Sequence, residues 1–280
     1  MPWNLDRLDQ PTLPLNGAYS YLGNGQGVTA YVIDSGIRTD HVEFAGRAAV
    51  GADLIGDGRN GQDCNGHGTH VAGLLGGATY GVAKQVRLVA VRVIACALTT
   101  TTDTVIAGVD WVTNDHQAGV PAVANMSISG PTSQALNDAV SRSIGDGIVY
   151  SVAAGNDATD ACTASPASVA SAITVGASWI VDSRGQIAPD HPATFSNFGS
   201  CVDIWAPGQE IVSAWNTSPS ASAADFGTSM ASPQVAGMTA VYLSAVPQAT
   251  PSEVSAAVIA NASASVVNVP AGSTNRQLTT

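Results

Sequence analysis

The sequence has few charged and few aromatic residues. Of its 280 residues, 11% are Asp, Glu, Lys or Arg, 5% are aromatic, and Lys84 is the only lysine. A typical globular chain has about a quarter of its residues charged. The formal net charge is -11 at pH 7, so the chain lacks the basic surface that binding to nucleic acid requires. We therefore expect no nucleic-acid partner.

Long apolar runs are also missing. No stretch reaches the roughly 18 consecutive apolar residues that span a bilayer, so we expect no membrane partner. Residues 1–3 do not resemble the start of a secretory signal peptide. No linker, repeat or block of charge divides the chain. We expect residues 1–280 to be a mature portion that folds as a single domain.

The four cysteines are widely spaced, and none belongs to a CxxC motif, which disfavours a zinc or thioredoxin-type site. They are Cys64, Cys96, Cys162 and Cys201. The preferred interpretation is two disulfides in an exported protein, and the alternative is reduced, buried cysteines in a cytosolic protein. Spacing alone allows three pairings.

Apolar runs of strand length alternate with helical patterns along the chain. Residues 28–33 form a continuous apolar run, which is typical of a parallel strand buried on both faces. We expect further strands at 86–94, 122–128, 147–154, 172–175 and 201–204, and helices at 67–77, 104–115, 133–144, 229–244 and 252–260. A Ser/Ala-rich loop is expected after residues 211–216. The first 26 residues are expected to form an arm, and residues 46–66 a loop. This alternation predicts an α/β fold with a mainly parallel sheet.

Ser229 lies where a Gly-Thr-Ser turn enters the predicted helix at 229–244. Serine at a helix start commonly caps the helix. It is also well placed to act as a nucleophile, because the backbone N–H groups there are unsatisfied and point outward. The segment alone does not decide between these two roles.

Polar residues that could assist a serine nucleophile occur elsewhere. Asp34 and Asn156 follow predicted strands, and His67 begins a predicted helix. Ligands collect at the carboxyl ends of parallel strands, so we expect these residues to lie together with Ser229. Acyl transfer by serine needs a base, a carboxylate that orients the base, and donors for the oxyanion. His67, Asp34, and the Asn156 amide with the Ser229 N–H would supply these parts.

Four specific strings of sequence surround these residues. They are Val32-Ile33-Asp34-Ser35-Gly36, Asn65-Gly66-His67-Gly68-Thr69-His70-Val71-Ala72-Gly73, Ala153-Ala154-Gly155-Asn156 and Gly227-Thr228-Ser229-Met230-Ala231-Ser232-Pro233. Together they resemble the subtilisin-like serine proteases, most closely the proteinase K branch and its disulfide- and calcium-containing bacterial members. The resemblance covers nearly the whole chain. It implies a three-layer fold with a central, mostly parallel sheet flanked by helices, a triad of Asp34, His67 and Ser229, and Asn156 as an oxyanion donor.

The resemblance implies a secreted serine endopeptidase that acts through an acyl-enzyme. Its implied partners are protein or peptide substrates and, during folding, its own propeptide, and we expect a monomer. An alternative with the same triad is an esterase or polyester depolymerase. A catalytically silent binding protein is a third interpretation, which the complete triad disfavours.

The resemblance implies that two edge segments, 98–101 and 127–130, hold an extended substrate between them. The implied substrate-binding residues are Leu98, Thr99, Thr100, Ser127, Ile128, Ser129, Ala153, Ala154 and Gly155. Leu98, Thr100 and Ser129 stand where the proteinase K group usually has glycine. Our hypothesis is a narrower, more selective cleft, and the alternative is neutral surface drift. Gln234, where the family commonly has histidine, is interpreted as a packing change that leaves the triad intact.

The resemblance also implies the disulfide pairing, namely Cys64–Cys96 and Cys162–Cys201. Closing loops of this size stabilises a fold by roughly 3–4 kcal/mol in the chain-entropy model. Cys64 lies three residues before His67, so the first bridge would also brace the loop that carries the histidine.

Calcium is the cofactor that the resemblance implies, in a structural role. Calcium binds carboxylates and carbonyl oxygens, and the first implied site combines the Asp203 carboxylate with the carbonyls of Ala170 and Ala172. The alternative for Asp203 is an ordinary turn aspartate.

A second implied calcium site consists of Asp6, Asp9 and Gln10. It is weakened because Ala18 lacks the side-chain oxygen that relatives supply there. The alternative for these acids is a salt bridge to Arg7 or plain solvation. No metal is expected on the acid-rich loop 53–63, where glycines replace acids found in relatives.

Overall fold

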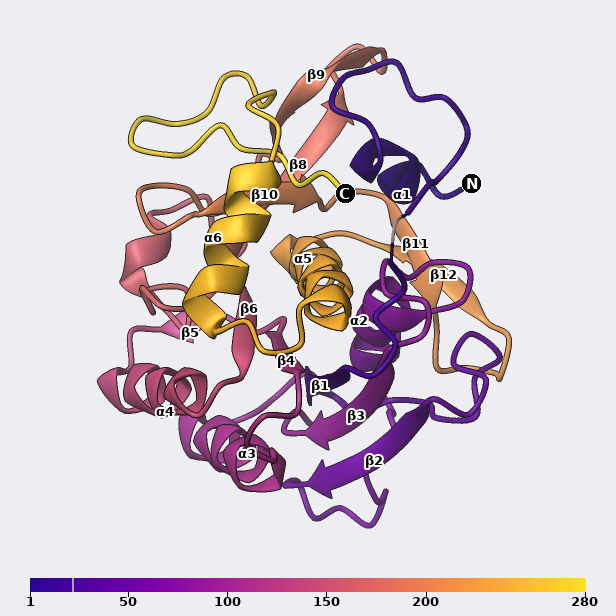
Figure 1. Cartoon of the computed structure of the whole chain (residues 1–280), viewed down its shortest axis with the longest axis vertical. Helices are drawn as coiled ribbons and strands as arrows, with labels where there is room; N and C mark the ends of the chain where they lie inside the picture. The colour runs from indigo at the N-terminus through magenta and orange to yellow at the C-terminus, as the bar shows by residue number, and fades with distance from the viewer. Residues whose placement is uncertain (22) are drawn as a thin grey trace.

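The computed structural model describes residues 1–21 and 23–280, which form helices around one central sheet (Figure 1). The sheet has eight strands in the order β10-β8-β6-β4-β1-β3-β2, with β9 beside β8. Its strands are β1 (Thr29–Asp34), β2 (Ala48–Asp53), β3 (Arg87–Arg92), β4 (Ala122–Met126), β6 (Val149–Ala153), β8 (Ile173–Val181), β9 (Ile187–Pro192) and β10 (Ile204–Pro207). The pairing is parallel throughout except between β8 and β9.

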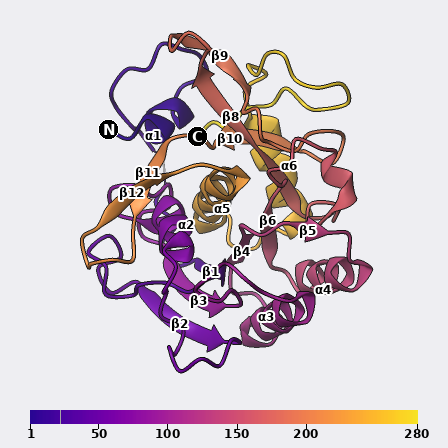
Figure 2. The ribbon, with the colours of Figure 1, turned by 180° about the vertical axis from the view of Figure 1, so that it is seen from behind.

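Helices cover both faces of this sheet (Figures 1 and 2). They are α1 (Trp3–Leu8), α2 (His67–Gly76), α3 (Thr102–Asp115), α4 (Gln134–Gly145), α5 (Thr228–Ala245) and α6 (Pro251–Asn261). Alternate residues of β1 explain the layers, since Ala30 and Val32 pack with α2 and α5, whereas Tyr31 and Ile33 pack with α3 and α4. The expected α/β fold with a mostly parallel sheet between helical layers is therefore confirmed.

Two antiparallel pairs lie outside the main sheet. One joins β11 (Ile211–Ala214) to β12 (Ser222–Asp225), and the other joins β5 (Gly130–Pro131) to β7 (Ala164–Ser165). A short 3₁₀ turn, η1 (Ala161–Thr163), precedes β7. Because β12 ends three residues before α5 begins, the hairpin fixes the approach of the chain to Ser229.

The structure corrects several sequence-based expectations. Strand β2 lies inside the expected loop 46–66, and its half-exposed small residues give little hydrophobic signal. Strands β9 and β12 and helix α1 were not expected. The strand expected at 201–204 is wrong, because the chain turns at Cys201 and the strand begins at Ile204. These elements depend on partners distant in the sequence, which a local pattern does not reveal.

Both ends of the chain are tied to the sheet. The buried guanidinium of Arg7 in α1 donates to both carboxylate oxygens of Asp190 in β9, at 2.7 and 2.6 Å. The amide of Thr280 donates to the carbonyl of Leu8 at 2.7 Å, so the termini lie near each other (Figure 1). Among the residues described, no helix combines the length and the apolarity needed to cross a bilayer.

Candidate active site

Asp34 and His67 form a buried hydrogen-bonded pair between β1 and α2. Asp34 is the last residue of β1 and is fully buried. Its Oδ1 accepts from His67 Nδ1 at 2.8 Å and from the Ser35 amide at 2.7 Å. A Cβ on Gly68 would lie 2.1 Å from the Gly36 carbonyl oxygen. Only glycine at position 68 therefore lets α2 approach the end of β1 closely enough for this pair to form.

Asp63 holds the start of α2, and the sequence analysis missed this role. Its Oδ1 accepts from the Gly66 amide at 2.9 Å, and its Oδ2 accepts from the amide and hydroxyl of Thr69 at 2.9 and 2.6 Å. A carboxylate at a helix N-terminus satisfies free N–H groups and complements the helix dipole. The available signal was an aspartate four residues before His67, which we counted only as part of an acid-rich loop.

The two disulfides join the pairs that the resemblance implies. The S–S distance is 2.10 Å in Cys64–Cys96 and 2.13 Å in Cys162–Cys201. Asn65 connects the first bridge to the histidine, because its Nδ2 donates to the Cys96 carbonyl at 2.9 Å and its Oδ1 accepts from the His67 amide at 3.2 Å.

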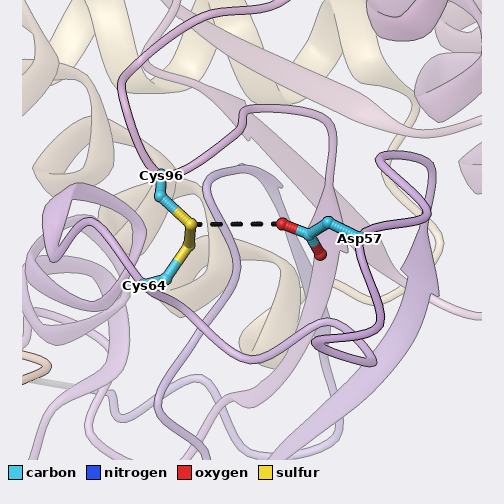
Figure 3. Close-up of side chains that lie close together, drawn as sticks. All are labelled: Asp57, Cys64 and Cys96. Carbon is cyan, nitrogen blue, oxygen red and sulfur yellow. Dashed lines mark hydrogen bonds between the residues drawn. A yellow bond between two sulfur atoms is a disulfide. The ribbon is translucent and has the colours of Figure 1, made fainter.

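Figure 3 shows Asp57 close to the Cys64–Cys96 bridge. These three residues are the one group of adjacent metal-ligand side chains in the described part of the chain. Both sulfurs are joined to each other, and Asp57 accepts from Arg92 at 2.6 and 2.8 Å. The hydrogen bonds from Arg92 lower the pKa of Asp57 to about 2. The cluster is therefore an ion pair beside a disulfide rather than a set of free metal ligands.

Ser229 lies in the first turn of α5 and shares a cavity of about 460 Å³ with His67 and Asn156. In the described structure its Oγ donates to the Ser127 carbonyl at 3.3 Å. This Oγ does not donate to His67 among the described residues, and in substrate-free sites the hydrogen bond between a nucleophile and its base is often long or poorly aligned. The cavity therefore brings together all four residues expected at the carboxyl edge of the sheet, with Asp34 directly behind His67.

Thr228 fixes the orientation of the Asn156 amide. Asn156 Oδ1 accepts from the Thr228 amide at 2.8 Å and from its hydroxyl at 2.9 Å. A Cβ built on Gly227 would lie 3.4 Å from Asn156 Nδ2 and 3.5 Å from the Ser229 nitrogen. The two nitrogen donors thus flank one small space, which stays open because residue 227 has no side chain.

A buried polar network behind Ser229 was also missed. Ser127 Oγ donates to the Ser229 carbonyl at 2.8 Å, and Asn125 Nδ2 donates to Ser127 Oγ at 3.0 Å. Ser232 Oγ completes the chain by donating to Asn125 Oδ1 at 2.8 Å. These bonds fix α5 against the segment that follows β4, so the serine and the expected substrate-binding edge keep one relative position.

Most of the expected substrate-binding residues line the cavity. The lining ones are Leu98, Thr100, Ser127, Ile128, Ser129 and Ala153. Thr99, Ala154 and Gly155 do not line it. The Thr99 carbonyl accepts from the Ala95 amide at 2.9 Å, and the loop that precedes α3 is thereby closed on itself.

Leu98 and Ser129, which stand where the family usually has glycine, affect the backbone and the space of the cleft. Leu98 adopts φ 56° and remains 55% exposed, in the left-handed region that glycine enters most easily. Ser129 Oγ would lie 2.8 Å from a Cβ placed on Gly155, so the serine occupies space between the two sides of the cleft. Gln234 is buried and donates to the Pro207 carbonyl at 2.6 Å, away from the cavity.

The two implied calcium sites differ in their surroundings. Asp203 Oδ2 accepts from the Thr174 amide at 2.8 Å, and burial raises the pKa of Asp203 to about 6 against the effect of that bond. Within the described residues Asp203 has no ion-pair partner. A half-buried carboxylate without a cationic partner fits a cation.

At the N-terminal cluster the carboxylates already bind backbone donors. Asp6 accepts from the amides of Asn16 and Gly17 at 3.0 and 2.8 Å, and Asp9 accepts from the Ser20 amide at 2.5 Å. The expected alternative of a salt bridge to Arg7 is wrong, because that guanidinium pairs with Asp190 instead.

Carboxylates around His67 control its protonation. Burial by itself would lower the pKa of His67, but the charge and hydrogen bond of Asp34, with the charges of Asp225 and Asp63, raise it above its ordinary value. His70 behaves differently, since burial lowers its pKa to about 4. Its Nε2 contacts the carbonyls of Ile211 and Ala223 at 3.0 and 3.2 Å, which agrees with the structural role expected for it.

The fold and this arrangement of residues match a known family. Residues 25–277 match the model of the subtilase family, and the chain belongs to that family. The resemblance to subtilisin-like serine proteases is thereby confirmed, and a position in the proteinase K branch is consistent with the relatives found.

Several named relatives are similar over most of the chain. An extracellular serine proteinase of Thermus sp. (strain Rt41A) is 53% identical over 265 residues, covering 95% of this chain and 62% of the relative. Alkaline serine exoprotease A of Vibrio alginolyticus is 48% identical, covering 99% of this chain and 49% of the relative. The chain thus spans about half to two thirds of the length of these relatives.

A solved structure also superposes closely. The crystal structure of a cold adapted subtilisin-like serine proteinase has a TM-score of 0.92 and 45% identity, covering 99% of this chain and 97% of that one.

The position of Asp225 beside the cavity yields a test of the electrostatics. Replacing Asp225 by Asn removes one negative charge that favours the imidazolium form of His67, so the pKa of His67 should fall. Titration of the His67 ring by NMR measures this shift. Asp157 lines the same cavity but is not among the charges that raise the pKa of His67, so the matched variant Asp157→Asn should lower this pKa less than Asp225→Asn does. Equal shifts in the two variants would contradict the role assigned to Asp225.

Proposed function

We propose that this chain is a secreted serine endopeptidase and that residues 1–280 act as one peptidase domain. The observation that carries the proposal is the hydrogen bond of 2.8 Å between His67 Nδ1 and Asp34 Oδ1, beside the cavity that Ser229 lines. The printed names of the bacterial relatives, extracellular serine proteinase among them, support both the activity and the location. The tying of both termini to the sheet supports a single domain.

The proposed reaction begins with proton transfer from Ser229 to His67. Nε2 takes the hydroxyl proton while Oγ forms a bond to the scissile carbonyl carbon, and Asp34 holds the Nδ1–H so that Nε2 is free to accept. The oxyanion receives hydrogen bonds from Asn156 Nδ2 and the Ser229 N–H. His67 then gives its proton to the leaving amine as the C–N bond breaks. Water, activated by the same histidine, releases the acid half and regenerates Ser229.

The cleft geometry supports the hypothesis of selective substrate binding. An extended peptide would bind between the edges at 98–101 and 127–130 through main-chain hydrogen bonds. The exposed Leu98 side chain and the Ser129 hydroxyl occupy space that glycine would leave open. The lining residues that the two edges and the end of β6 contribute are all uncharged, which favours uncharged side chains before the scissile bond; they are Leu98, Thr100, Ser127, Ile128, Ser129 and Ala153.

A sulfonyl fluoride inhibitor tests the nucleophile. It should form one covalent adduct on Ser229 in the folded protein, because Ser229 shares the cavity with the proposed base His67 and with the proposed oxyanion donor Asn156. Mass spectrometry of the digested protein locates the adduct, and Ser229→Ala is the control that should remain unlabelled. An unlabelled Ser229 in protein that is folded by circular dichroism would refute the proposal. Hydrolysis of polyester films without hydrolysis of casein would replace the peptidase by a polyester depolymerase.

The oxyanion role of Asn156 gives a kinetic prediction. Asn156→Ala should lower kcat by about 10²–10³-fold with little change in KM, because the donor acts mainly in the transition state. Asn156→Asp keeps an oxygen that accepts from Thr228 and replaces the Nδ2 donor by a negatively charged carboxylate oxygen. Steady-state kinetics on a peptide substrate should show at least as large a loss for Asp. Near-normal kcat in Asn156→Asp would show that the amide nitrogen has no such role.

We also propose that calcium binds structurally at Asp203 with the carbonyls of Ala170 and Ala172. The cation would supply a positively charged partner for the Asp203 carboxylate, which forms no ion pair with the described residues. It takes no part in the reaction. The N-terminal cluster of Asp6, Asp9 and Gln10 is the other implied site, where a cation would compete with the backbone N–H donors already bound.

Chelation tests the Asp203 site. The pKa of Asp203 is raised in the metal-free fold to about 6 from 3.8, so this group destabilises the metal-free protein increasingly as pH rises from about 4 to 6, and constantly above that range. We expect EGTA at pH 7.5 to lower the Tm of the Ser229→Ala protein. Asp203→Asn should remove most of that response, and Asp6→Asn should preserve it. A Tm that is unaffected by EGTA would exclude both implied sites.

A further inference from the structure

A second pocket, of about 330 Å³, adjoins the cavity that contains Ser229. Its lining includes Phe195, Gln209 and Glu210. Asp225 and Phe226 line both this pocket and the cavity of Ser229. The two spaces are therefore neighbours that share these two residues as a common border.

One wall of this pocket is aromatic. The rings of Phe195 and Phe226 pack with their centroids 5.5 Å apart, and Phe226 remains 64% exposed. A large aromatic side chain that is mostly exposed beside a functional cleft is a feature of binding surfaces. Its flat face is suited to the aliphatic stem and the charged head of a long basic side chain.

The lining also includes two carboxylates, Glu210 and Asp225. Neither forms an ion pair within residues 1–21 and 23–280. Glu210 adopts φ 53°, a left-handed conformation that is uncommon for a residue with a side chain, and its carbonyl accepts from Trp3 Nε1 at 3.3 Å. Unfavourable backbone conformations persist where the surrounding structure holds them, and they concentrate at binding sites.

The hairpin that carries Asp225 and the end of the edge 127–130 lie on different sides of α5. Figure 1 shows the hairpin β11–β12 on one side of this helix and β5, which begins at Gly130, on the other. In the proposed function, the edges 98–101 and 127–130 hold the part of the substrate before the scissile bond. The part after the scissile bond, which leaves as the amine product, must then extend toward Phe226.

We propose that this pocket binds a lysine or arginine side chain from the first or second residue after the scissile bond. The stem would pack on Phe226 and Phe195, and the cation would lie between Glu210 and Asp225. This inference rests on the proposed function, and it adds a preference for positive charge on the leaving-group side of the substrate.

Internally quenched peptides test the preference. The peptides differ only in having arginine, its neutral isostere citrulline, or glutamate at the first or the second residue after the scissile bond. For the parent protein we expect kcat/KM for arginine to exceed that for citrulline by about five-fold at one of these positions, with glutamate poorer than citrulline. Glu210→Gln should reduce this ratio, and Glu210→Gln with Asp225→Asn should bring it to about one. Because each variant is compared with itself, any change in His67 that is the same for all the peptides cancels from the ratio.

Two controls make the result specific. Glu253 is an exposed carboxylate in the first turn of α6, and Glu253→Gln should leave the arginine-to-citrulline ratio unchanged. Raising the salt concentration to 1 M should lower the ratio, because exposed charges are screened. Equal cleavage of the arginine and citrulline peptides by the parent protein would overturn the inference and leave the proposed function intact. Cleavage of none of the peptides would overturn the proposed function itself.

Discussion

The hydrogen bond between His67 and Asp34 is the constraint on which the site depends. It joins the buried end of β1 to the first residue of α2. The position of the helix relative to the strand is therefore tightly constrained. Gly68 permits the close approach, and Asp63 satisfies the N–H groups that the helix start leaves free. Burying a carboxylate is costly unless it is hydrogen-bonded, and Asp34 Oδ1 accepts two hydrogen bonds, whereas Oδ2 has no partner among the described residues. The Cys64–Cys96 bridge and the loop beside it therefore help to hold His67 against Asp34.

Hydrogen bonds also fix the two nitrogen donors beside Ser229, namely the Asn156 amide and the Ser229 N–H. Thr228 uses its amide and its hydroxyl to turn the Asn156 carboxamide, and the backbone of the next residue supplies the other nitrogen donor. Asn125, Ser127 and Ser232 connect the same helix to β4 below it. Donors that are fixed before the substrate binds need no reorganisation as negative charge develops, and this is the main source of electrostatic stabilisation in acyl transfer.

The sequence predicts those parts of the molecule that local patterns encode. The buried strand at 28–33 and the helix at 229–244 have continuous apolar character, and the residues at their ends stand in specific strings. Strand β2 and helix α1 could not be predicted in this way, because small or polar residues form them and distant partners such as Asp190 hold them. The capping by Asp63 was missed for the same reason. Its role depends on where Thr69 and Gly66 lie in space, which a count of acidic residues does not reveal.

Asp225 lines both the cavity of Ser229 and the pocket formed with Phe195 and Phe226. Its negative charge also raises the pKa of His67. A basic substrate side chain bound in that pocket would partly neutralise this charge and so weaken the stabilisation of the imidazolium form of His67. The protonation state of the base would then depend on what is bound. An acidic environment would inhibit the cleavage of neutral peptides more strongly than that of basic ones. One carboxylate would in this way couple substrate choice to ambient acidity.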